Sequence, residues 1–231
     1  MAKKIMWDKG HGGKDPGAVG NGLQEKVITN KIVNYAMTYL TANYMGFEQR
    51  TTRTGDQSTS LAQRSNLANN WGADAFISVH INAGGGTGFE SYIYNGGVGP
   101  ATINLQNSIH AEVLKAMRGF GSVTDRGKKR ANFAVLTGTK MDAVLTENLF
   151  IDTKADADKL KNEAFIKAVG EAHALGVAKY FELPVKPKQV PKEQRQKVDL
   201  ITGWYYEDSP KLAELEKFLK DRGFNYRIEK A

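Results

Sequence analysis

The chain has 231 residues, no cysteine and a formal net charge of +7. This length suits one full domain with a small appendage, and a domain of that size buries a substantial core without covalent cross-links. Apolar residues make up 41% of the sequence and charged residues 25%, which excludes wholesale disorder. The lack of cysteine excludes disulfide scaffolds, cysteine-ligated metals and thiol catalysis. The positive charge favours polyanionic partners, although solvated surface Lys and Arg give the same balance.

The N-terminal residues MAKKIMWDKGHGG contain an apolar stretch that is too short for a secretory signal peptide. No later run reaches the 18 or more apolar residues of a membrane span. We therefore expect a protein that is made in the cytoplasm and has neither an export signal nor a membrane span of its own.

Strand-like and helix-like segments alternate through residues 1–182. A short apolar run at 4–7 predicts a strand, and the apolar spacing over 25–44 predicts a helix after the glycine-rich stretch 10–22. The segments expected next are a strand at 47–51, a helix at 61–71 capped by Ser60, a buried strand at 74–79, a strand at 89–94, a helix at 101–117, short strands at 133–136 and 143–146, and a helix at 163–181. This alternation predicts an α/β layer fold with a largely parallel or mixed sheet.

The composition changes after residue 182. Three prolines and several lysines predict an extended, semi-rigid linker at 183–196. Beyond it, the pattern predicts a small β-α-β module over 197–231, with a helix that begins at Ser209-Pro210. A module of this size rarely forms a core alone, so we expect it to pack on the main domain, on a second copy or on a ligand.

Two of the four histidines stand where predicted strands end in glycine-rich loops. His11 lies in Asp8-Lys-Gly-His-Gly-Gly13, and His80 ends the buried strand in Ser78-Val-His-Ile-Asn82. Sites in open α/β sheets lie beyond the carboxyl ends of the strands. Two imidazoles from neighbouring strands could therefore converge there.

Two glutamates could complete such a site. Glu25 opens the first long helix directly after the loop that carries His11, and a helix N-terminus favours a carboxylate. His11, Glu25 and His80 would form a ligand set suited to Zn²⁺, with a fourth position left for water. Glu147 follows the apolar run 143–146 and could serve as general base and then general acid. Spacing alone leaves the alternative open, because lone His and Glu side chains are usually structural or solvated.

Other polar side chains have structural interpretations beside the functional ones. His110 and His173 lie on apolar helix faces, which favours packed, hydrogen-bonded histidines. Arg64 could contact substrate or pair with an acid. Arg126 has the same two alternatives, although a basic group near the cleft would suit carboxylates. Asn82 could fix the loop geometry or orient a ligand. Neither glycine-rich stretch matches a P-loop or a dinucleotide-binding fingerprint.

Seven sequence blocks follow one another along residues 1–182. They are Asp8-Lys-Gly-His-Gly-Gly-Lys-Asp-Pro-Gly-Ala18, Glu25, Arg64, Ser78-Val-His-Ile-Asn-Ala83, Gly88-Phe-Glu-Ser-Tyr92, Arg126-Gly-Lys128 before Phe133-Ala-Val-Leu136, and Ala143-Val-Leu-Thr-Glu-Asn-Leu-Phe-Ile151. In this order they resemble the zinc-dependent N-acetylmuramoyl-L-alanine amidases of the amidase-3 family. The resemblance implies a mixed, mostly parallel twisted sheet flanked by helices. It also implies one catalytic zinc and cleavage of the amide between N-acetylmuramic acid and the L-alanine of the peptidoglycan stem peptide.

Carried over position by position, the resemblance implies that His11, Glu25 and His80 are the zinc ligands and that Glu147 is the catalytic acid/base. Arg64, Asn82 and Arg126 remain candidates for substrate binding. Two positions depart from the family pattern: Lys9 stands where a small residue or proline is more usual, and Asn148 stands where glycine is usual.

The expected function is therefore peptidoglycan hydrolysis by zinc-activated water, for lysis of a host cell. The enzyme would reach the wall after release, through a membrane-permeabilising holin or on cell lysis. Residues 197–231 would bind cell wall or mediate self-association. The alternative is a non-catalytic wall-binding protein with an amidase-like fold, and a nucleic-acid-binding role has only the charge in its favour.

Overall fold

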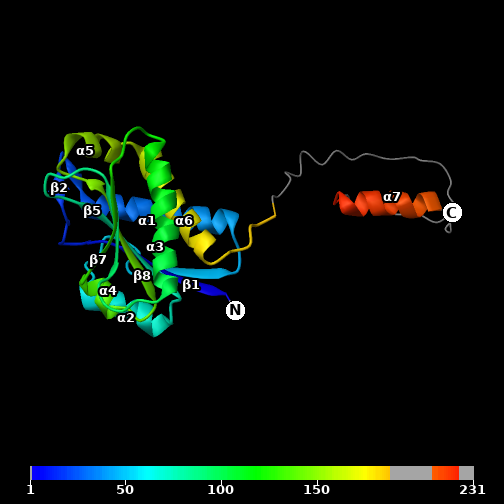
Figure 1. The fold of residues 1–231 in the computed structure, drawn as a ribbon, viewed down its shortest axis with the longest axis horizontal. Coiled ribbons are helices and arrows are strands. Elements are labelled where there is room, and N and C mark those ends of the chain that lie inside the picture. Colours follow the sequence, from blue (N-terminus) through cyan, green and yellow to red (C-terminus); the bar gives the residue numbers. More distant parts are fainter. Residues whose placement is uncertain (1, 188–209, 224–231) are drawn as a thin grey trace. The chain divides into compact units, whose positions relative to one another are not determined.

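The computed structural model describes residues 2–187 and 210–223. Contacts between Cα atoms divide the chain into two units, Met1–Pro187 and Lys188–Ala231, and each is described by itself. Figure 1 shows the arrangement of helices and strands within the first unit.

A six-stranded sheet forms the centre of the first unit. Its strand order is β4-β1-β5-β8-β6-β7, and β6 against β8 is the antiparallel pair within it. The strands are β1 (Lys3–Lys9), β4 (Phe47–Thr51), β5 (Ala75–Asn82), β6 (Phe89–Tyr94), β7 (Asp125–Ala131) and β8 (Asp142–Phe150), with a small hairpin of β2 (Val19–Gly20) and β3 (Leu23–Gln24) beside them. The mixed, mostly parallel sheet expected from the sequence is confirmed.

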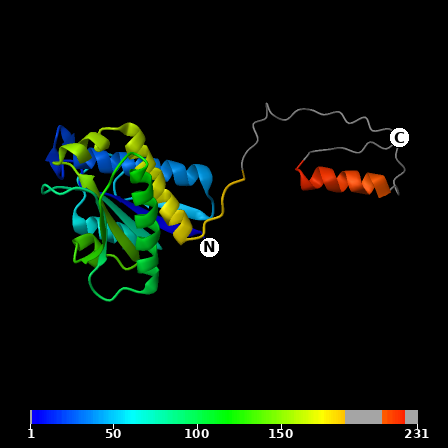
Figure 2. The ribbon, with the colours of Figure 1, turned by 45° about the horizontal axis from the view of Figure 1, so that its top comes forward.

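Helices cover both faces of this sheet (Figure 2). The helices of the first unit are α1 (Glu25–Asn43), α2 (Leu61–Trp71), α3 (Pro100–Arg118), α4 (Ala134–Gly138), α5 (Lys154–Leu160) and α6 (Glu163–Tyr180). Buried residues of α1, α3 and α6 pack in one hydrophobic cluster, and those of α2 and α4 pack in a second, smaller one. Because side chains alternate between the faces of a strand, the strands β1, β5, β6 and β8 contribute to both clusters. Met6 and Phe76 belong to the smaller cluster, whereas Trp7 and Ile77 belong to the larger.

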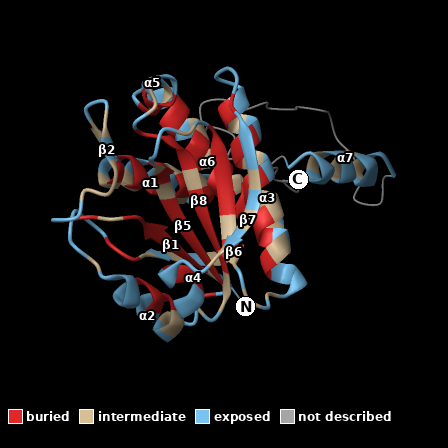
Figure 3. Cartoon of the chain, turned by 60° about the vertical axis from the view of Figure 1, so that its left-hand side comes forward, coloured by how far each residue is buried: buried red, intermediate tan, exposed pale blue. Residues whose placement is uncertain are grey.

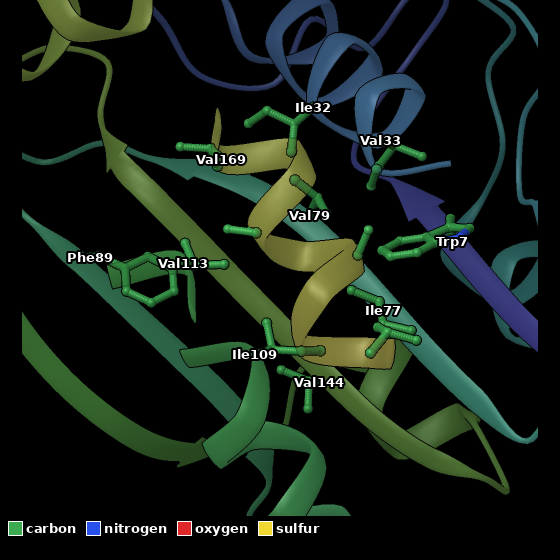
Figure 4. Packing of buried hydrophobic residues seen from close by; sticks show 14 of the residues in the cluster. Trp7, Ile32, Val33, Ile77, Val79, Phe89, Ile109, Val113, Val144 and Val169 are labelled. Atoms are coloured by element: carbon green, nitrogen blue, oxygen red, sulfur yellow. The ribbon is translucent and has the colours of Figure 1, made fainter. Parts of the chain in front are cut away.

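The larger cluster is the main core. Figure 4 shows Trp7, Ile77 and Val79 of the strands packed against residues of the three long helices. All three are completely buried. Burial differs between the centre and the edge of the sheet. Figure 3 shows that β5 and β8 are mostly buried, whereas the edge strand β7 is largely exposed. The continuous apolar runs of the central strands follow from burial on both faces.

One expectation in the middle of the chain is wrong, and one strand was not predicted. Residues 133–136 were expected to form a strand, but 134–138 form the short helix α4, whose Val135 and Leu136 close the smaller cluster. A short apolar run fits a strand and a buried helical turn equally well. The strand β7, Asp125–Ala131, has no apolar alternation because it lies at the sheet edge, where charged side chains face solvent and discourage pairing with other chains.

The start of the expected linker contacts the first unit. Val185 forms an isolated antiparallel bridge with Tyr44, and the backbone N–H of Lys186 donates to the carbonyl of Asn43. In the second unit, α7 (Pro210–Asp221) begins at the proline that the sequence marked as a helix start. The rest of the linker 183–196 and the expected strands of the module 197–231 lie outside the described residues. Within the part of the chain that the structure describes, no helix combines the length and the hydropathy needed to cross a bilayer.

Candidate metal centre and active site

Three side chains from distant parts of the sequence meet at one edge of the sheet. His11 follows β1, Glu25 is the first residue of α1, and His80 lies near the end of β5. Parallel pairing aligns β1 with β5 and brings the two strand ends together. One possible ligand atom from each of the three residues lies within 4.8 Å of the other two.

Glu25 stands between the two imidazoles. Its Oε2 lies 3.1 Å from His11 Nε2 and its Oε1 lies 2.9 Å from His80 Nδ1. The same oxygens accept hydrogen bonds from backbone N–H groups, Oε2 from Ala18 at 2.8 Å and Oε1 from Ile81 at 2.9 Å. Only 3% of Glu25 is exposed. The carboxylate is therefore held in one orientation before any ligand binds.

The glycine-rich loop permits this close approach. A Cβ on Gly17 would lie 2.5 Å from His11 Cδ2 and 2.6 Å from Glu25 Oε2, and Gly17 has a φ of +66°. A Cβ on Gly10 would lie 2.6 Å from His80 Cε1. The loop can thus carry only glycine at these two positions without displacing the three converging side chains.

Asp15 orients the His11 ring, a role that the sequence reasoning missed. Its Oδ2 lies 2.8 Å from His11 Nδ1, and its Oδ1 accepts a hydrogen bond from the backbone N–H of Gly17 at 3.0 Å. A carboxylate on Nδ1 fixes the tautomer that presents Nε2 as a metal ligand. The sequence signal for this contact was the spacing of four residues between His11 and Asp15 in the same loop.

Arg64 is buried and holds the backbone of the loop that carries His11. Its Nη1 lies 2.7 Å from Asp8 Oδ1, and its Nη2 donates to the carbonyl of His11 at 2.7 Å. The side chains of Arg64 and Asp8 are 4% and 0% exposed. The structure therefore shows the acid pairing that the sequence left open beside substrate contact. Arg53, which the sequence did not single out, donates to the carbonyls of Lys9 and Gly10.

Glu147 lies next to this cluster on the same face of the sheet. It is the cross-strand partner of His80 in β5 and of Glu90 in β6. Its Oε2 is shielded from solvent and has no hydrogen-bond partner among the described residues. Burial, with the nearby charges of Glu25 and Glu90, raises the pKa of Glu147 to about 7 against the opposing effect of His80. A carboxyl with this pKa exchanges protons readily near neutral pH.

The charges of the three candidate ligands compensate one another. Burial opposes protonation of His11, but the contacts with Glu25 and Asp15 outweigh it and raise its pKa to about 9. Burial likewise opposes ionisation of Glu25, yet the two histidines hold the pKa of Glu25 well below its usual range. Two ring nitrogens and one buried carboxylate are a donor set that suits Zn²⁺. A divalent cation would take the place of the imidazole protons. The residues therefore fit a zinc ion.

The other candidates lie beside Glu147 or away from it. Asn82 Nδ2 donates to Glu90 Oε1 at 2.7 Å, and Arg126 Nε donates to Glu90 Oε2 at 3.0 Å. The sequence reasoning also missed Glu90, although a charged residue inside an otherwise apolar strand was a usable signal. His110 and His173 are buried and hydrogen-bonded in the core, His110 to Ser91 and His173 to Thr146, as the apolar helix faces indicated.

The sequence and the fold match one family. Residues 5–179 match the family described as N-acetylmuramoyl-L-alanine amidase. The chain is 53% identical over 180 residues to the sporulation-specific N-acetylmuramoyl-L-alanine amidase of Bacillus subtilis, which covers 78% of this chain and 69% of that protein. It is 38% identical over 239 residues to the endolysin of Bacillus phage SPP1, across 97% of this chain and 88% of that protein.

A solved structure shows the same relationship. The catalytic domain of CwlV, an N-acetylmuramoyl-L-alanine amidase from Bacillus (Paenibacillus) polymyxa var. colistinus, superposes with a TM-score of 0.72 at 31% identity and covers 78% of this chain and 99% of that one. By sequence, by fold and by the grouping of His11, Glu25 and His80, the chain belongs to the N-acetylmuramoyl-L-alanine amidase family.

Proposed function

We propose that this protein is a zinc-dependent peptidoglycan amidase that hydrolyses the amide between N-acetylmuramic acid and L-alanine, and that it acts in host-cell lysis. The observation that carries the proposal is the convergence of His11, Glu25 and His80 beside Glu147, whose Oε2 has no partner among the described residues. A buried carboxylate without a partner is costly, which favours a catalytic role over a purely structural one.

The residues divide the reaction between them. Zinc held by His11 Nε2, Glu25 and His80 Nδ1 would supply Lewis-acid activation of the substrate carbonyl and of a water molecule. Glu147 accepts a proton as the water oxygen bonds to the carbonyl carbon. It then donates that proton to the nitrogen of L-alanine as the C–N bond breaks. The products are a lactyl carboxylate on the glycan and a free L-alanine amino group on the peptide.

Mass analysis of purified walls tests both the bond and the acid/base. The protein should release L-alanine amino groups while the glycan remains intact, and Glu147→Gln should keep its zinc and its fold but lose most turnover. Glu171→Gln, on the exposed side of α6, is the matched control and should behave as the unmodified protein does. Near-normal release by Glu147→Gln would reject Glu147 as the acid/base. Binding to walls without any release would show a non-catalytic wall-binding protein instead.

Removal of the metal tests the cofactor. Excess chelator should abolish release of L-alanine amino groups, and added Zn²⁺ should restore it. The reason is that the cation held by His11, Glu25 and His80 would activate the substrate carbonyl. Unchanged activity in a verified zinc-free sample would reject zinc dependence.

For residues 197–231 we propose cell-wall binding or self-association, with 183–196 as the linker. The similarity to the phage SPP1 endolysin spans 97% of the chain, so it includes this region. The same similarity supports synthesis in the cytoplasm and action on the wall after release. Sedimentation with insoluble peptidoglycan and analytical ultracentrifugation of the full chain separate the two roles of the module.

A further inference from the structure

Arg126 is held rigidly at the far side of Glu147. Its Nε donates to Glu90 Oε2 at 3.0 Å, and its guanidinium carbon lies 4.8 Å from the centre of the Phe150 ring. Glu90 is 2% exposed and Phe150 is 3% exposed, so both supports belong to the folded sheet. The side chain has therefore already lost most of its rotational freedom, which reduces the entropic cost of binding a ligand.

This anchoring leaves the binding end of the guanidinium free. Among the described residues, neither terminal nitrogen of Arg126 has a hydrogen-bond partner, and 33% of the side chain is exposed. The two terminal nitrogens form the planar fork that matches a carboxylate in a bidentate manner. A guanidinium whose Nε is occupied and whose fork is free is prepared for an anionic ligand.

The charges around Glu90 point to the same ligand. Lys129 Nζ also bonds to Glu90 Oε2, so Arg126 and Lys129 share one buried carboxylate. Lys129 is 38% exposed, and its ammonium group lies 5.8 Å from the centre of the Tyr92 ring. Two cations on a single carboxylate make this end of the site locally positive, which suits a carboxylate of the substrate.

The position of Glu90 and Arg126 relative to Glu147 indicates which carboxylate of the substrate can reach the Arg126 guanidinium. Glu90 and Glu147 are cross-strand partners, and neighbouring strands lie about 4.8 Å apart. In a stem peptide, the residue after L-alanine is D-glutamate joined through its γ-carboxyl, and its α-carboxyl is free or amidated. An extended chain of two residues spans about 7 Å. That α-carboxyl, the first after the scissile amide, can therefore reach the Arg126 fork while the scissile nitrogen lies at Glu147.

We infer that Arg126, anchored by Glu90, binds the α-carboxylate of the second stem residue and makes the enzyme prefer D-glutamate over D-isoglutamine at that position. This inference rests on the proposed amidase function. Lys129 adds charge to the site, and Glu90 acts through Arg126 as a positioning residue.

Paired substrates test the inference. Two preparations of glycan strands would carry stem peptides that differ only at the second residue, which is D-glutamate in one and D-isoglutamine in the other. The full-length zinc-loaded protein should show a kcat/KM about tenfold or more higher for the acid form, because a charge-assisted bidentate contact is lost with the amide. In Arg126→Gln the ratio of the two kcat/KM values should fall to near one, mainly through KM for the acid form.

Three controls distinguish a specific carboxylate contact from a general effect of charge and from loss of folding. Arg130→Gln removes a cation from the same strand whose side chain donates to the carbonyl of Gly96, and it should keep the preference. Arg126→Lys keeps the charge without the fork and should retain only part of the preference. Zinc content and the urea unfolding midpoint of each variant report on folding.

Each outcome has a distinct meaning. Equal cleavage of both substrates by the unmodified protein, or a preference that survives in Arg126→Gln, would overturn the carboxylate site and leave the amidase function intact. If the unmodified protein cleaves neither substrate at the muramoyl amide, the proposed function fails as well.

Discussion

Replacing Glu147 with glutamine should stabilise the zinc-free protein, and the gain should grow as the pH rises from about 5 to about 7. The cause is the burial that raises the pKa of Glu147 from 4.5 to about 7. In the unfolded chain this carboxyl ionises near its ordinary pKa, so between these two values the folded protein holds a proton that the unfolded chain has released. The contribution of Glu147 to stability therefore falls with rising pH across this window and stays level above it.

The size of the effect follows from the shift. One pKa unit corresponds to about 1.4 kcal/mol, so the full shift corresponds to about 3 kcal/mol. Glu147 is not completely buried, and solvent screening reduces the expected gain to about 2 kcal/mol. Glutamine has nearly the same shape and does not titrate. The difference in unfolding free energy between Glu147→Gln and the unmodified protein should thus be near zero at pH 4.5 and about 2 kcal/mol above pH 7.

Urea unfolding at half-unit pH steps, followed by circular dichroism, measures this difference. The samples must be zinc-free, because a bound cation would add its own charge to the site. Glu171→Gln on the exposed side of α6 is the control and should show no such pH dependence. A Glu147→Gln difference that does not change between pH 4.5 and 7.5 would refute the reasoning that burial of an unpartnered carboxyl sets its pKa.

Two further substitutions probe the supports of the site. Arg64→Ala should lower the unfolding free energy by about 3–5 kcal/mol, because it leaves Asp8 buried without its cation. A urea unfolding midpoint close to that of the unmodified protein would contradict this. Asp15→Asn should weaken zinc binding about 10- to 100-fold in chelator competition, since the amide no longer fixes the His11 tautomer as a carboxylate does. An unchanged zinc affinity would show that the loop backbone alone orients the ring.

Much of the fold could be predicted because the central elements have one dominant signal each. Burial on both faces makes β5 a continuous apolar run, and the capping box of Ser60 and Gln63 marks the start of α2. The strand β7 gave no such signal, since its position at the sheet edge leaves its side chains in solvent. The short helix α4 was read as a strand because tertiary packing, and not periodicity, decides the structure of five residues.

The candidate ligands could be placed because each follows a recognisable boundary, either a strand end or a helix start. Their supports could not be placed, because hydrogen bonds between residues far apart in sequence leave no local pattern. Arg64 reaches Asp8 across 56 positions, and Arg126 reaches Glu90 across 36. From the sequence alone both arginines looked alike as candidates for substrate binding. Burial separates them, since Arg64 is enclosed with its acid and Arg126 keeps a free fork at the surface.

The register of the sheet accounts for the difference between the two neighbouring glutamates of the site. His80, Glu147 and Glu90 form one cross-strand row, so all three point to the face that α2 and α4 cover only in part. Glu90, nearer the edge, is neutralised by the basic residues of β7, whereas Glu147, in the middle of the row, has no cation within hydrogen-bond reach among the described residues. A slip of one residue in β8 would turn Glu147 into the main core and abolish the raised pKa. The same register that packs the core therefore leaves this carboxyl able to take and give a proton.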